Sequence, residues 1–199
     1  MKSVELVPLQ EIAFDFRDLL DCFDRNIFKE PFIPKNVWRN LGKHFNLKEW
    51  NKKLEKYRVQ IVEVKTRLKP RPEVLAIYHD EECKIDLTIS NLKLFSGIED
   101  LKFGVIQTIM HEMIHANQFF RHPDAYSKVI EEQEKEYENY HAKFGEVEAF
   151  SHCIALEYLR EGRWGAGNTL RRYKNCSPKI QRLLHKNTKK WVEVYHENL

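Results

Sequence analysis

Apolar and polar residues alternate strictly along residues 83–90, CKIDLTIS. Alternation of this kind is typical of a strand with one buried face and one exposed face. Segments 57–64 and 73–79 are rich in β-branched residues and predict two more strands. The HDEE segment that precedes Cys83 suits a hairpin turn between the second and third strands. The pattern therefore predicts a small antiparallel sheet.

Helical periodicity surrounds these strands. Apolar residues recur at helical spacing within 14–23 and 37–45, which predicts N-terminal helices. After the strands, Ser96 and Glu99 form a capping box, so a long helix is expected to begin near Gly97 and to end at Pro123. Further helices are expected after Asp124, over 146–160, and from 177 onward. Helices, sheet and helices in this order predict an α+β fold with segregated elements.

Composition narrows the class of protein only moderately. The net charge of +3, from 33 basic and 30 acidic residues, is too even to indicate nucleic-acid or membrane binding. Acidic residues throughout the first 21 positions argue against a signal peptide, and no stretch has the length of apolar sequence that a membrane span needs. The four cysteines form no C-x-x-C pair, which favours reduced thiols and a cytoplasmic location.

The predicted long helix contains the sequence HEMIH at 111–115. His111 and His115 are four residues apart, so they lie one turn apart on the same helix face and can share one metal ion. Glu112 is rotated by about 100° from His111 and lies beside the metal instead of binding it. It can accept a proton from a zinc-activated water and pass that proton to a leaving amine. This pattern predicts one zinc ion, with Glu112 as the general base.

A catalytic zinc ion needs a third protein ligand. His122 lies one residue away from the metzincin position and beside Pro123, which disfavours it, and His141 lies on an apolar stripe. Glu148 is preferred because small residues surround it on its own helix and would let that helix approach the metal helix closely. A carboxylate that faces inward also needs a partner, since burying it unpaired is costly. Glu146 is a further candidate. Both glutamates also suit a helix's first turn, where acidic residues favour the helix dipole.

The sequence resembles the zincin metallopeptidases, and the gluzincins among them, over residues 83–160 at most. HEMIH and the later Glu148-Ala149 pair carry the resemblance. The resemblance, together with a length that suits one domain, indicates a single zincin-like metallopeptidase domain over 1–199, with an N-terminal helical part (1–56), a catalytic core (57–160) and a C-terminal helical part (161–199). It also implies zinc bound by His111, His115 and Glu148, a peptide or protein substrate, and 83–90 as the edge strand that binds it. The sequence departs from the family's pattern four residues after Glu148, where thermolysin-like enzymes have an aspartate and this chain has His152.

Two alternative hypotheses remain. The segment TIMHEMIHANQ is also similar to SprT/Spartan-type proteases, which cut proteins crosslinked to DNA, and His141 in HAKF would then bind the metal. Basic residues near the C-terminus could contact phosphates, although the even overall charge favours solvated helix faces as the explanation for them. The second alternative is a non-catalytic zinc-binding regulatory protein. A fourth protein ligand that closed the metal site would favour it.

Overall fold

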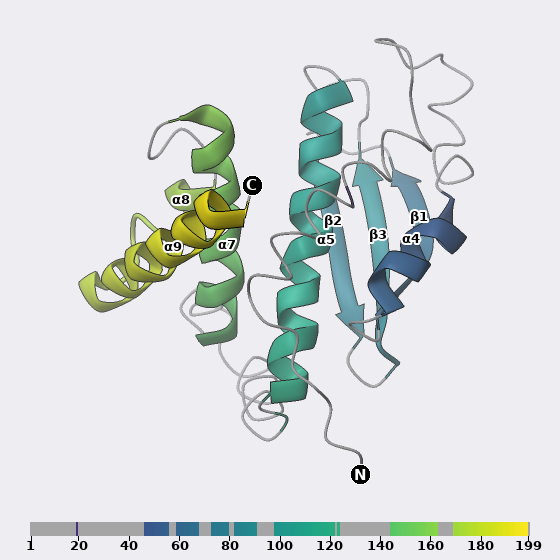
Figure 1. Ribbon diagram of the computed structural model, residues 1–199, viewed down its shortest axis with the longest axis horizontal. Helices are drawn as coiled ribbons and strands as arrows, with labels where there is room; N and C mark the ends of the chain where they lie inside the picture. The colour runs from purple at the N-terminus through teal and green to yellow at the C-terminus, as the bar shows by residue number, and fades with distance from the viewer. Residues whose placement is uncertain are drawn as a thin grey trace. The chain divides into compact units, whose positions relative to one another are not determined.

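The computed structural model describes residues 19, 46–55, 59–67, 73–79, 82–90, 98–121, 123, 144–162 and 169–198. The chain divides into two compact units, Phe14–Ala116 and a second made of Met1–Ala13 with Asn117–Leu199. Figure 1 shows the helices and strands of the described residues. The helices expected over 14–23, over 37–45 and after Asp124 lie outside the described residues, apart from Leu19, which is helical and buried.

The sheet has three strands, β1 (Gln60–Arg67), β2 (Glu73–His79) and β3 (Lys84–Ser90). Their order is β1-β3-β2. β2 and β3 form the expected antiparallel pair, but β1 runs parallel to β3. The prediction of a purely antiparallel sheet was therefore wrong. Alternation along a strand reports which face is buried and carries no information about which strand becomes its neighbour.

The turn between β2 and β3 ends at Cys83, which has a positive φ of 52°. Cys83 was predicted on the buried face of the strand, but it lies in the turn and its carbonyl accepts a hydrogen bond from the Gln60 amide at 3.1 Å. Beside it, the ammonium of Lys84 lies 2.7 Å from the Glu82 carboxylate. The hydrogen bond and positive charge of Lys84 lower the pKa of Glu82.

Helix α4 (Leu47–Leu54) packs beside β1. The Asn46 side chain caps it by accepting a hydrogen bond from the Glu49 amide. From the helix, Asn51 donates to the Ile61 carbonyl at 3.0 Å and accepts from the Ile61 amide at 2.7 Å. These bonds occupy both backbone groups of Ile61, where the register of β1 shifts. A polar side chain thus satisfies backbone groups on an edge strand.

Helix α5 (Ile98–Arg121) begins and ends close to its predicted limits. Its residues up to 116 belong to the unit that contains the sheet. The core of that unit has side chains no more than 1% exposed: Ile61, Ile85, Leu87 and Ile89 from the sheet, and Leu101, Val105, Ile106 and Ile109 from α5. The apolar face of the strands is therefore buried in the same core as one face of α5, the helix that contains HEMIH.

The other unit contains helices α7 (Phe144–Glu161), α8 (Thr169–Arg172) and α9 (Pro178–Asn198). α7 and α9 match the predicted helices, whereas α8 was not predicted. Directly after α7 comes Gly162, whose φ of 68° suits a glycine cap and whose amide donates to the Tyr158 carbonyl at 2.8 Å. α9 begins at Pro178, directly after Ser177, whose hydroxyl accepts from the Ile180 amide.

α7 and α9 pack closely against each other (Figure 1). The Ser151 hydroxyl donates to the Val147 carbonyl at 2.5 Å and lies 3.3 Å from the Leu184 carbonyl of α9. His152 is fully buried, and its Nε2 lies 2.6 Å from the Tyr195 hydroxyl. The Trp191 ring meets the His152 ring edge-on at 4.7 Å. Ser151 and His152 of α7 can therefore be buried, because groups on α9 form hydrogen bonds with their side chains.

The described structure is an α+β arrangement of a small mixed sheet and several helices. Cys83, Cys153 and Cys176 are thiols that take part in no disulfide bond. Of the helices in the described part of the chain, none combines the length and hydrophobicity that a membrane crossing requires.

Candidate functional site

The two histidines of HEMIH lie together on α5. His115 is 8% exposed and His111 is partly buried. Their Nε2 atoms are 3.1 Å apart, and their rings meet edge-on with centroids separated by 4.7 Å. The four-residue spacing produces this arrangement because consecutive helical turns place both side chains on the same face. The same two nitrogen atoms were expected to bind the metal.

Glu112 points toward the sheet. Its side chain is 8% exposed, and its Oε2 accepts a hydrogen bond from the backbone amide of Tyr78 at 3.1 Å. Tyr78 lies on β2, at one edge of the sheet. A backbone amide of the sheet therefore holds the carboxylate that was expected to act as the base. A sequence motif does not reveal such a contact, since the donor is a main-chain group of a distant strand.

The position of β3 corrects one expectation. The resemblance implied that 83–90 forms the edge strand, but β3 lies at the centre and pairs with both other strands. The edges are β1 and β2. β3 has the clearest alternation because three of its side chains, Ile85, Leu87 and Ile89, are fully buried. The strict alternation therefore indicates a strand with one fully buried face, and it does not indicate an edge position.

The two candidate carboxylates begin α7, in the other unit. Glu146 is 3% exposed, whereas Glu148 is partly buried. The Gln118 amide of the same unit donates to Glu148 Oε2 at 2.9 Å and to the Gly145 carbonyl at 3.0 Å. Glu148 therefore has the polar partner that a half-buried carboxylate needs.

Gln118 was not recognised in the sequence, although its spacing offered a signal. It lies seven residues after His111 and three after His115, so all three share one face of α5. A hydrogen-bonding residue that continues a histidine face is a candidate partner for a nearby carboxylate. His122 and His141 lie outside the described residues. His152 contacts Tyr195 and Trp191 in the interior of the helical unit.

Replacing Gln118 with methionine is expected to lower the free energy of unfolding by about 1–2 kcal/mol, because a hydrogen bond to a charged acceptor is lost while side-chain volume is kept. Urea denaturation followed by circular dichroism measures the change. Gln60→Met, at an exposed position, is the control and should change stability by less than about 0.5 kcal/mol. Equal effects of the two substitutions would show that the Gln118 contacts contribute nothing.

Comparison of the chain with protein-family models, curated proteins and solved structures found no match.

Proposed function

We propose that this protein is a zinc-dependent metallopeptidase that hydrolyses peptide bonds. The observation that supports it best is the 3.1 Å separation between the Nε2 atoms of His111 and His115. Two nitrogen ligands at 2.0–2.1 Å from a tetrahedral zinc ion are about 3.3 Å apart. The two imidazoles therefore need to move by only a few tenths of an ångström to share the ion.

A carboxylate from the start of α7 is the proposed third ligand. Glu146, whose side chain is 3% exposed, is one candidate. Glu148 is the other candidate, and it bonds to Gln118, which continues the histidine face of α5. Two positions on a helix that are two residues apart point about 200° from each other. One of the two glutamates, and not both, should therefore face the ion.

Glu112 is the proposed general base. A bound zinc ion would supply a Lewis acid that lowers the pKa of a water ligand to about 7. Glu112 lies next to His111 in sequence, and the Tyr78 amide fixes one of its oxygen atoms at 3.1 Å. The carboxylate is thus held in one orientation, from which it would accept a proton and deliver it to the leaving amine.

The proposed substrate is an extended peptide that runs along β2. This strand is at an edge of the sheet, and its Tyr78 amide is directed at Glu112. Amides two residues apart on a strand point in the same direction, so those of Val74 and Ala76 share the side of Tyr78. A peptide that pairs with this edge would bring a carbonyl group close to Glu112.

Loading the purified chain with one equivalent of zinc tests the proposal. We expect hydrolysis of an unstructured protein such as casein, loss of activity after treatment with a chelator, and recovery when zinc is restored. Mass spectrometry of the products identifies the cleaved bonds. Stoichiometric zinc without any cleavage would favour the non-catalytic zinc-binding protein instead. Cleavage only in the presence of DNA would favour the DNA-associated protease.

A further inference from the structure

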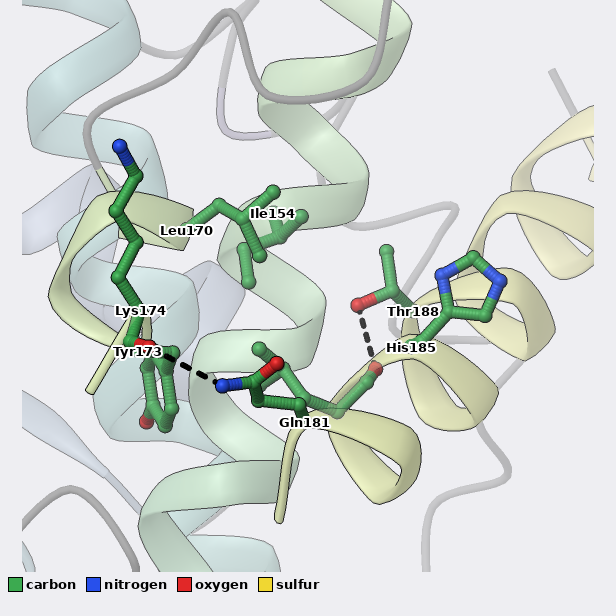
Figure 2. Close-up of a pocket in the computed structure, with 8 residues that line it drawn as sticks. Ile154, Leu170, Tyr173, Lys174, Gln181, His185 and Thr188 are labelled. Atoms are coloured by element: carbon green, nitrogen blue, oxygen red, sulfur yellow. Dashed lines mark hydrogen bonds between the residues drawn. The ribbon is translucent and has the colours of Figure 1, made fainter. Parts of the chain in front are cut away.

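The C-terminal helical unit contains a cavity of about 300 Å³ between α7, α8 and α9 (Figure 2). Ile154, Leu170, Tyr173 and Leu184 line it. Three of these side chains are 3% exposed or less, and Leu170 packs against them. The volume lies at the lower end of the range of about 300–1,000 Å³ that is usual for small-molecule sites. The walls are apolar and therefore suit a short hydrocarbon body.

Hydrogen bonds within the unit hold the walls in place. The Gln181 amide donates to the Lys174 carbonyl at 3.2 Å (Figure 2) and to the Cys176 carbonyl at 2.8 Å, which fastens the segment after α8 to α9. On α9, the Thr188 hydroxyl donates to the Leu184 carbonyl at 2.8 Å. The Tyr173 ring also meets the Phe150 ring at 5.7 Å. The cavity is thus formed before any ligand enters.

The ionisable groups that line the cavity are basic. Lys174 and His185 lie at its margin, both are exposed, and no lining residue is acidic. In Figure 2 the Lys174 stem extends beside Leu170 and ends in its ammonium group. The sequence from Gly162 to Val192 contains many lysines and arginines but no aspartate or glutamate. Among the lining residues, the positive charge of Lys174 therefore favours an anion over a cation.

We propose that this cavity binds a small monocarboxylate with an apolar body, of the medium-chain fatty acid class. The hydrocarbon chain packs against Ile154, Leu170 and Leu184, and the carboxylate lies toward Lys174, which extends beside Leu170 (Figure 2). A single lysine suits one negative charge better than a phosphate dianion, which needs more donors. None of the lining residues belongs to HEMIH, and the inference does not depend on the proposed peptidase activity.

Isothermal titration of the full chain with octanoate tests the proposal. We expect saturable one-to-one binding, and an affinity that rises by about fourfold for each CH₂ from hexanoate to octanoate, since a buried CH₂ contributes about 0.8 kcal/mol. Octylammonium has the same hydrocarbon chain and the opposite charge, and it should bind at least about tenfold more weakly. Equal affinity for the two ions, or no saturable binding of octanoate, would overturn the proposal.

Lys174→Gln should weaken octanoate binding by about two- to fivefold, because the expected ion pair is exposed. Lys190→Gln, at an exposed lysine of α9 that does not line the cavity, should leave it unchanged. If both substitutions weakened octanoate binding equally, the preference for an anion would come from the general positive charge of this part of the chain and not from the cavity. That result would overturn the proposal. Displacement of octanoate by a short DNA duplex would identify the basic segment as a phosphate-binding surface and would also overturn the proposal.

Discussion

Replacing Glu112 with glutamine is expected to leave zinc bound and to slow peptide hydrolysis by about 10²–10⁴-fold, the usual contribution of a general base. Glutamine has nearly the same shape, and its carbonyl oxygen can still accept the hydrogen bond that the Tyr78 amide donates to Glu112 at 3.1 Å. The local structure should therefore persist. An amide cannot accept a proton from water at neutral pH, so the proton transfer that the proposed mechanism requires is lost.

The measurement is initial-rate hydrolysis of a fluorogenic peptide derived from a cleaved site, at equal zinc content per chain. Glu99→Gln is a matched control because Glu99 is an exposed glutamate on the same helix. We expect this control to retain the native rate. If Glu112→Gln retained more than about one tenth of the native rate, Glu112 would not be the base. Zinc content measured by atomic absorption separates this result from simple loss of the metal.

Replacing His115 with alanine is expected to abolish the stabilisation that zinc confers on the folded chain. A ligand present at a hundred times its dissociation constant stabilises the folded state by about 2.7 kcal/mol. For a chain of this size, this corresponds to a rise in Tm of about 5–10 °C. Because the Nε2 atoms of His111 and His115 are 3.1 Å apart, removing either imidazole destroys the pair that the ion would share.

Differential scanning fluorimetry with and without zinc measures this effect. His196→Ala is the control, since His196 is exposed near the end of α9, and it should keep the full shift in Tm. A zinc-dependent shift of native size in His115→Ala would exclude the pair as ligands. The same assay on Glu146→Gln and Glu148→Gln distinguishes the two candidate carboxylates, because only the ligand should lose most of the shift.

Local patterns in the sequence predicted the elements that carry the candidate site. The HEMIH helix begins at Ile98, one residue after the expected position, and α7 covers the predicted 146–160. Helical periodicity and caps depend on neighbours within a few residues, so the sequence contains the information needed. The same holds for the His111–His115 contact, because a spacing of four residues produces it in any α-helix.

Contacts between distant segments were not predictable in this way. Small residues around Glu148 were expected to let α7 approach the metal helix closely. Nothing in the sequence indicated that one of them, Ser151, would hydrogen-bond to the Leu184 carbonyl on α9. Asn51, which bonds to both backbone groups of Ile61, also had no signal in the sequence. Polar residues of this kind reveal their roles only through the partner that tertiary packing brings to them.

The sequence by itself determined that two imidazoles share a helix face, with a glutamate beside them, and that three strands precede this helix. Tertiary structure decided that β3 is central, that the β2 edge offers its Tyr78 amide to Glu112, and that Gln118 bonds to Glu148. The physical reason is the range of the forces that select each feature. Helix geometry repeats every few residues, whereas strand order and buried polar partners depend on which distant surfaces exclude water together.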